Sequence, residues 1–160
     1  MTPDWERVVQ ERLPVFGHRN WIVVADSAYP VQASAGIETI AAPCDIPTAL
    51  ASTLKLLETA PHLTATVYID RELRFIAEHD APGVSRYRSA LDRQVASLAR
   101  RELPHEEIIA KLDHASRVFR ILIVKTTTTI PYTSIFLELG CGYWTPEAEG
   151  RLRDAMDRSK

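Results

Sequence analysis

Long hydrophobic runs are missing from this sequence of 160 residues, although 46% of its residues are hydrophobic. No stretch approaches the roughly 20 consecutive apolar residues that a membrane-spanning helix needs. The first six residues, Met-Thr-Pro-Asp-Trp-Glu, also lack the apolar segment of a signal peptide. We therefore expect no membrane partner and no export.

Cysteine is scarce as well. Only Cys44 and Cys141 occur, and they do not form a Cys-x-x-Cys pair. Small exported domains that depend on disulfides are much richer in cysteine, so this usage predicts a protein of the reducing cytoplasm. Free cysteines commonly lie in protein interiors as small hydrophobic residues, which is the role we expect for both.

An excess of charge of one sign is missing too. The chain has 19 Lys and Arg against 21 Asp and Glu, which gives a net charge of -2. Such a balance gives no reason to expect nucleic acid or an anionic membrane surface as a partner.

Common catalytic and nucleotide-binding motifs are also absent. The sequence contains no Gly-x-Gly-x-x-Gly, Walker A, Gly-x-Ser-x-Gly or His-Glu-x-x-His motif, which argues against nucleotide, serine-hydrolase and zinc-peptidase chemistry. His105 and His114 are nine residues apart, and therefore fall on roughly opposite faces of a helix. We expect neither a metal nor an organic cofactor.

What is present is an alternation of strand-like and helix-like segments, typical of an α/β protein. We predict one domain over residues 1–160, with a mostly parallel sheet and helices on both faces. Thr2 is the expected cap of the first helix. The predicted strands cover residues 21–25, 37–40, 63–69, 119–125 and 134–139. The predicted helices cover residues 3–13, 45–59, 84–101, 106–118 and about 145–158, the second beginning at Asp45 or Thr48.

One stretch combines a buried strand with two polar residues that could do chemistry. Trp21 to Ala25 are apolar without alternation, as expected for a strand buried on both faces. His18 precedes this strand and Asp26 follows it, at the end where α/β proteins bind ligands. Five strand residues separate them by roughly 17 Å. His18 and Asp26 can therefore meet only if a loop curls back or a second subunit contributes one of them.

Three segments carry a resemblance to a known family. They are Gly17-His18 with the following strand and Ala25-Asp26-Ser-Ala-Tyr-Pro30, then Arg86-Tyr-Arg-Ser-Ala-Leu91, and lastly Ile121-Leu-Ile-Val-Lys-Thr with Pro131-Tyr-Thr-Ser-Ile-Phe-Leu137. Together they resemble the D-ribose pyranase / L-fucose mutarotase family over about residues 5–142. The predicted helix at about 145–158 extends past the usual end of that family.

The resemblance implies a cytoplasmic, cofactor-free isomerase. Such an enzyme interconverts cyclic forms, anomers or pyranose and furanose, of a free ribose-like or fucose-like monosaccharide. It forms a ring-like homo-oligomer with its sites at subunit contacts. The family's acid histidine corresponds to His18, and its sugar-binding positions correspond to Asp26, His105, Tyr132, Thr133 and Ser134.

Two departures from the family pattern bear on the sugar. Ser134 stands where the family has asparagine, and it is shorter, with a different hydrogen-bonding reach. The threonine run at 126–129 replaces a Gly-Glu pair of the family.

The chemistry is compatible with these residue types. Opening a hemiacetal ring requires a proton at the ring oxygen and removal of one from the anomeric hydroxyl. Histidine titrates near neutral pH and can serve both steps. Our hypothesis is that His18 transfers the proton while Asp26 and Tyr132 hold sugar hydroxyls.

Each of these residues also has a simpler interpretation. His18 could cap the end of the first helix, Asp26 could cap the loop after its strand, and Tyr132 could be a packed aromatic residue. The threonine run could be a β-prone edge segment. Two alternatives to catalysis therefore remain: a non-catalytic monosaccharide- or metabolite-binding oligomer of the same fold, and a structural oligomer with a vestigial pocket.

Overall fold

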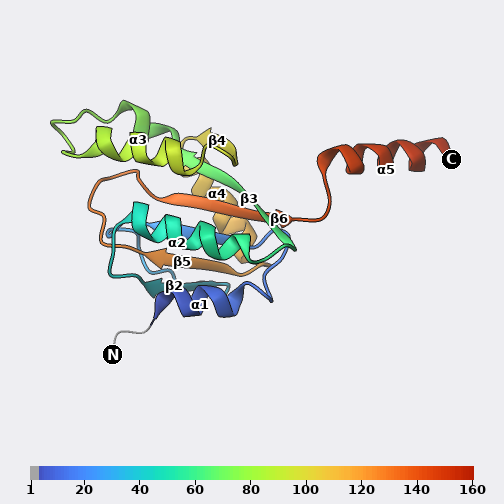
Figure 1. Cartoon of the computed structure of the whole chain (residues 1–160), viewed down its shortest axis with the longest axis horizontal. Coiled ribbons are helices and arrows are strands. Elements are labelled where there is room, and N and C mark those ends of the chain that lie inside the picture. The colour runs from blue at the N-terminus through green and yellow to red at the C-terminus, as the bar shows by residue number, and fades with distance from the viewer. Residues whose placement is uncertain (1–3) are drawn as a thin grey trace.

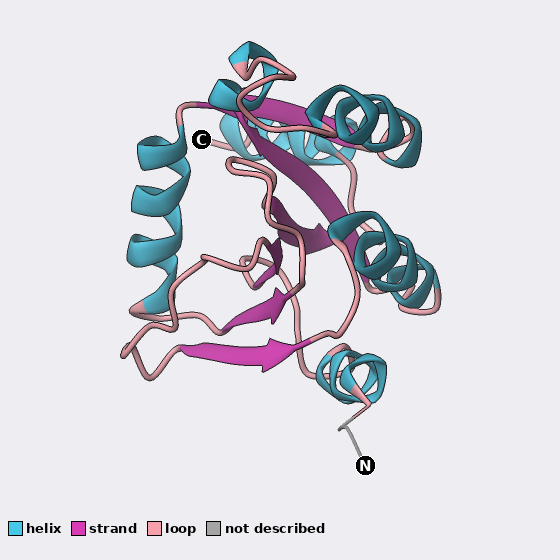
Figure 2. Cartoon of the chain, turned by 90° about the vertical axis from the view of Figure 1, so that its left-hand side faces the viewer, coloured by secondary structure: helices cyan, strands magenta, loops and turns pink. Residues whose placement is uncertain are grey.

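The computed structural model describes residues 4–160, which form one six-stranded sheet with helices on both faces (Figures 1 and 2). The strands are β1 (Trp21–Ala25), β2 (Ile37–Ala41), β3 (Leu63–Asp70), β4 (Ala99–Leu103), β5 (Ile121–Lys125) and β6 (Ile135–Cys141). The helices are α1 (Trp5–Arg12), α2 (Ile46–Glu58), α3 (Val84–Gln94), α4 (His105–Ser116) and α5 (Pro146–Arg158), and a 3₁₀ helix, η1, covers Arg71–Phe75. Within residues 4–160, no helix combines the length and the apolar character needed to cross a membrane.

The sheet is parallel except for one strand. Its order is β2-β5-β1-β6-β3-β4, and β6 runs antiparallel to both of its neighbours. Val23 at the centre of β1 is paired with Ile123 of β5 and Phe136 of β6. The predicted mostly parallel α/β sheet with helices on both faces is confirmed. All five residues of β1 are buried, as its unbroken apolar sequence predicts.

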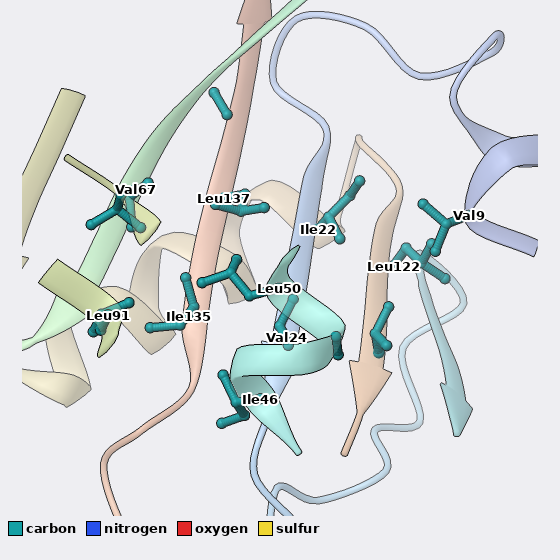
Figure 3. Packing of buried hydrophobic residues seen from close by; sticks show 14 of the residues in the cluster. Val9, Ile22, Val24, Ile46, Leu50, Val67, Leu91, Leu122, Ile135 and Leu137 are labelled. Atoms are coloured by element: carbon teal, nitrogen blue, oxygen red, sulfur yellow. The ribbon is translucent and has the colours of Figure 1, made fainter. Parts of the chain in front are cut away.

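Two hydrophobic layers cover the sheet. The larger packs α1, α2 and α3 against one face, where Ile22, Val24 and Leu122 meet Ile46 and Leu50 (Figure 3). On the other face, α4 packs its buried Ile108 and Leu112 against the sheet. Each strand of the sheet centre therefore contributes alternate side chains to opposite layers.

The sequence prediction fails at the end of α3. A helix was expected over residues 84–101, but α3 ends at Gln94 and residues 99–103 form the edge strand β4. This strand consists of Ala-Arg-Arg-Glu-Leu and is largely exposed, so it lacks the apolar pattern of a strand. Its conformation comes from parallel pairing with Thr66–Asp70 of β3. The Arg100 guanidinium also donates hydrogen bonds to the carboxylates of Asp92 and Glu102, at 2.7 and 3.0 Å.

The helix ends near the N-terminus are fixed by side chains. The Asp4 carboxylate accepts hydrogen bonds from the backbone of Glu6 and Arg7 and thereby caps α1, whereas the expected cap, Thr2, lies outside the described residues. At the other end of α1, Nε2 of His62 donates to the carbonyls of Leu13 and Phe16, at 2.9 and 3.1 Å. The capping role considered for His18 is thus filled by His62.

The threonine-rich loop after β5 connects three parts of the fold. Thr126 is buried, and its Oγ1 donates to the Ala25 carbonyl at 2.7 Å. Thr128 is also buried, and its Oγ1 accepts from the Ile46 amide at the start of α2. The run is therefore a connection anchored by its two buried threonines, Thr126 and Thr128, and not an edge strand.

The next segment of this loop is fixed by α3. The Tyr87 hydroxyl donates to the Thr133 carbonyl, and both residues are buried. The Thr133 hydroxyl in turn donates to the Ile130 carbonyl at 2.6 Å. These two bonds determine the path of residues 130–133 before β6 begins.

Replacing Tyr87 with Phe tests this connection. The substitution leaves the buried Thr133 carbonyl without its donor, so we expect the free energy of unfolding to fall by about 1–2 kcal/mol. Urea denaturation followed by circular dichroism measures it. Tyr143→Phe is the matched control, because Tyr143 is 78% exposed, and should change stability by less than about 0.5 kcal/mol. Equal stabilities for the two variants would show that the bond contributes nothing.

Candidate functional site

A pocket of about 440 Å³ lies where several strands end at one edge of the sheet. Parallel strands β1 and β3 end at this edge, and the antiparallel β6 begins there. The segments after β1 and β3, the start of α4 and the loop before β6 therefore converge. The lining residues are Asp26, Ala28, Tyr29, Pro30, Gln32, Asp70, His105, Glu106, Ile109, Pro131 and Tyr132.

Asp26 is held in place by Ser134. The Ser134 hydroxyl donates to Oδ1 of Asp26 at 2.5 Å and accepts from the Asp26 amide at 3.0 Å. Ser134 itself is only 2% exposed. Within residues 4–160 we find no partner for Oδ2 of Asp26. This carboxylate therefore has a fixed orientation and one oxygen available to a ligand.

A carboxylate at the end of β3 holds His105. Its Nδ1 lies 3.0 Å from both carboxylate oxygens of Asp70, the last residue of β3. The Glu72 carboxylate accepts from the His105 backbone amide at 3.0 and 3.1 Å. Because an ionised carboxylate only accepts, the His105 proton belongs on Nδ1, and Nε2 remains as the basic nitrogen of the ring.

The Asp70 carboxyl group is almost completely buried, with 1% of the residue exposed. Burial raises the pKa of Asp70 to about 6, and the adjacent His105 opposes this effect. By bonding Nδ1, this carboxylate keeps the His105 imidazole in one orientation and one tautomer.

Two tyrosines complete the pocket. Tyr132 has a left-handed backbone (φ 58°), which is uncommon for a residue other than glycine, and its ring meets His105 edge-on at 5.7 Å between centroids. Tyr29 is 5% exposed, and its hydroxyl has no hydrogen-bond partner among residues 4–160. Burial raises the pKa of Tyr29 to about 12, and the nearby Gln32 side chain opposes this effect, so the hydroxyl is neutral and can donate a hydrogen bond to an acceptor.

The pocket contains three of the predicted site residues: Asp26, His105 and Tyr132. Ser134 stands behind Asp26 and orients it. The Thr133 side chain is fully buried and bonded to Ile130, so it is not part of the pocket lining.

His18 lies away from the pocket. It is exposed in the turn before β1, at the opposite end of that strand from Asp26. The separation expected from the strand length is therefore present, and within one chain His18 and Asp26 do not meet.

Sequence reasoning missed Asp70 and Tyr29. The signal for Asp70 was available, because it follows the β-rich run Leu63–Ile69 just as Asp26 follows the apolar strand β1. Tyr29 lies in the stretch that carries the family resemblance, but an unpartnered hydroxyl can be recognised only from the packed structure.

Two larger cavities lack this combination of groups. One, of about 580 Å³, lies between α2 and β3, and the other, of about 750 Å³, lies beside the threonine run. Neither is lined by histidine, and the carboxylate in the larger one, Asp45, caps α2. In the part of the chain that the structure describes, no three His, Cys, Asp or Glu side chains are clustered as a metal site requires.

Solved structures with the same fold come from several bacteria. The RbsD of Bacillus subtilis, solved with D-ribose, is 21% identical with a TM-score of 0.57, over 83% of this chain and 91% of that one. The fucose mutarotase of Streptococcus pneumoniae, solved with L-fucose, is 23% identical with a TM-score of 0.54, over 87% and 92%. FucU from Bifidobacterium longum is 14% identical with a TM-score of 0.52, over 87% and 93%.

A search of curated proteins gave no match. The model of one protein family, however, matches residues 7–142 of the sequence, which is most of the chain. This chain belongs to the RbsD / FucU transport protein family.

Proposed function

We propose that this protein interconverts the cyclic forms of a free monosaccharide by acid–base opening of the ring, and is thus an isomerase that needs no cofactor. The observation that carries the proposal is the pocket in which Asp26, the His105–Asp70 pair and Tyr132 converge. Family membership supports it, since two relatives of the same fold were solved with D-ribose and L-fucose.

The reaction needs two proton transfers. A base removes the proton from the anomeric hydroxyl while an acid protonates the ring oxygen, and the bond between the anomeric carbon and the ring oxygen breaks. The open-chain aldehyde then closes on its other face, or through another hydroxyl, with the protons returned. Because no electrons or groups leave the sugar, side chains that donate and accept protons suffice.

The pocket offers suitable groups for binding. Oδ2 of Asp26 can accept a hydrogen bond from a sugar hydroxyl, and the Tyr29 hydroxyl can donate one. The exposed Tyr132 provides an aromatic edge and a second hydroxyl. His105 is oriented by Asp70 so that Nε2 can accept a proton or a hydrogen bond.

We assign the second proton-transfer group to His18 of a neighbouring copy. His18 is exposed before β1, so it is accessible to another chain but not to the pocket of its own. This assignment requires a homo-oligomer in which the turn at residues 17–20 approaches the pocket of the next copy.

The direct test is magnetisation-transfer NMR on reducing pentoses, hexoses and deoxyhexoses. Wild-type protein should raise the exchange rate between anomers, or between ring forms, above the rate in buffer. His18→Ala should lower the catalysed rate by about 10²–10⁴-fold, the usual contribution of a general acid or base. His79→Ala is the control, since His79 is exposed and outside the pocket. Absence of exchange with every sugar would overturn the proposal.

Sharing of the site between copies can be tested by mixing inactive variants. His18→Ala and Asp26→Ala chains should each be inactive, while co-assembled chains should recover activity at roughly a quarter of the sites, because random assembly pairs an intact His18 with an intact Asp26 at that frequency. The double variant His18→Ala/Asp26→Ala, mixed with either single variant, should recover nothing. If the first mixture recovers no activity, either both residues belong to the site of a single chain or one of them is not part of the site.

A second candidate function is sugar binding without catalysis. It is favoured by the short bond between Ser134 and Asp26, which occupies one carboxylate oxygen. Calorimetry that shows sugar binding, together with NMR that shows no exchange, would select this alternative.

Tyr29→Phe tests the unpartnered hydroxyl. Because this group has no hydrogen-bond partner among residues 4–160, its removal should leave the free energy of unfolding unchanged or slightly higher. Sugar affinity should fall by about 2–10-fold, as expected for one hydrogen bond. Calorimetry measures the affinity, with Tyr143→Phe as the exposed control. An unchanged affinity would remove Tyr29 from the proposed site.

Asp70→Asn tests the buried carboxyl group through pH. The folded protein holds the Asp70 proton more tightly than the unfolded chain does, because burial raises its pKa to about 6. The free energy of unfolding should therefore fall as the pH rises from about 4 to about 6, by up to about 2–3 kcal/mol. Asp70→Asn should abolish this loss, whereas Asp113→Asn, at an exposed position of α4, should retain it. If the free energy of unfolding changes with pH between 4 and 7 in the same way for both variants, the raised pKa does not belong to Asp70.

A further inference from the structure

A second cavity, separate from the candidate site, lies between helix α3 and the threonine-rich loop after β5. Its volume is about 750 Å³, which is within the range of pockets that hold small organic ligands. The first half of α3 forms one side of it, and the loop together with the start of α2 forms the other (Figure 1). None of its lining residues belongs to the sugar pocket.

The α3 side of this cavity has two arginines. Arg86 and Arg93 both line it and are both exposed. They are seven residues apart, so their side chains leave the helix within about 20° of each other and about 10.5 Å apart along its axis. The small Ala90 lies between them. Because arginine side chains are long and flexible, both guanidinium groups can reach one group bound above Ala90.

These two positive charges have no carboxylate partner on their own helix. The residues three and four positions away from each arginine are proline, glycine, serine and alanine, so the usual helical ion pair cannot form. Two carboxylates at the ends of α3 are engaged elsewhere. Asp92 accepts from Arg100 at 2.7 Å, and Glu78 accepts from backbone amides at the start of α3. Within residues 4–160 we find no ion-pair partner for either arginine.

The opposite side of the cavity presents free hydroxyl groups. Along the threonine run, Thr126 and Thr128 are buried and bonded to the backbone of other segments, whereas Thr127 and Thr129 are exposed and line the cavity. The Thr127 amide donates to the Cys44 carbonyl at 2.9 Å, which holds the loop in place. Within residues 4–160, neither of the two exposed hydroxyls makes a hydrogen bond. Each is therefore available to donate to a ligand oxygen.

Asp45 supplies the one carboxylate that the described residues contribute to this cavity. It caps α2 by accepting from the Thr48 amide at 3.0 Å, and its charge is partly offset there by the positive end of the helix dipole. Asp45 repels an anion at the α2 end of the cavity but can accept hydrogen bonds from neutral hydroxyls. The charges therefore favour a ligand with its anionic group near α3 and its hydroxyls near α2.

We propose that this cavity binds the phosphate group of a small phosphorylated polyol, such as a sugar phosphate. Arg86 and Arg93 hold the phosphate, because a guanidinium group stays charged and can donate two parallel hydrogen bonds to phosphate oxygens. Thr127 and Thr129 add hydroxyl donors, and Asp45 accepts from the hydroxyls of the ligand. Inorganic phosphate carries the same group, but it would fill only a small part of the cavity. The inference is independent of the proposed isomerase activity.

Calorimetric titration with glucose 6-phosphate and with inorganic phosphate tests the site. Both arginines are exposed, so their variants should fold, which circular dichroism verifies. Arg86→Ala and Arg93→Ala should each lower the affinity for the sugar phosphate by about 10–100-fold, as expected for a lost hydrogen bond to a charged group. Arg151→Ala is the matched control, because it removes the same charge from the exposed helix α5. This control should change the affinity by less than about 2-fold.

The two probes distinguish the two sources of phosphate. Tighter binding of the sugar phosphate would identify a phosphorylated polyol as the ligand, and equal affinities would identify inorganic phosphate. Either result supports the site when the Arg86 and Arg93 variants lose the binding. Asp26→Ala, in the sugar pocket, should bind the sugar phosphate like the wild-type protein.

Three results would overturn the proposal. The first is that neither probe binds at concentrations up to about 10 mM. The second is an equal loss of affinity in Arg151→Ala, which would show that only the net charge matters. The third is loss of binding in Asp26→Ala with retention in Arg86→Ala and Arg93→Ala, which would place the sugar phosphate in the sugar pocket.

Discussion

The two hydrogen bonds between Asp26 and Ser134 join the end of β1 to the beginning of β6, and the candidate site depends on that junction. Because β6 is the one antiparallel strand, it starts at the edge where β1 and β3 end. The loop that precedes it therefore brings Tyr132 beside residues that follow two parallel strands. Ser134 fixes the carboxylate of Asp26, and Tyr87 fixes the backbone one residue earlier, at Thr133. A parallel strand in the place of β6 would begin at the other edge and leave the pocket without Tyr132.

A second carboxylate repeats the same arrangement on β3, the parallel strand on the other side of β6. Asp70 ends β3 as Asp26 follows β1, but it is more deeply buried and interacts with an imidazole instead of solvent. Its burial raises its pKa, and its bond to Nδ1 of His105 leaves Nε2 as the basic nitrogen. The two carboxylates thus have different roles: Asp26 is suited to hold a hydroxyl, and Asp70 to orient a base.

Most of the fold could be predicted from the sequence, because apolar runs such as Trp21–Ala25 and helix caps such as Asp45 are local signals. The edge strand β4 could not, because Arg100 and Arg101 are ordinary helix residues and only pairing with β3 makes this segment extended. In the site, the positions of Asp26, His105 and Tyr132 in one pocket follow from strand ends and from the family resemblance. The roles of Asp70 and Tyr29 depend on burial and on hydrogen bonds across the fold. Local sequence patterns do not predict such contacts between distant segments. The placement of His18 at the far end of β1 agrees with the strand length, and the role that we propose for His18 requires a neighbouring copy.

The central claim is that one small pocket binds a monosaccharide with groups from two copies of the chain. A crystal structure of the assembled protein, soaked with ribose or fucose, tests it most directly. We predict a sugar with hydroxyls bonded to Asp26 and Tyr132, His105 within hydrogen-bonding distance of the ring, and His18 of the adjacent copy near the ring oxygen. A pocket that stays empty at saturating sugar, or a sugar bound elsewhere with His18 facing solvent, would contradict the account.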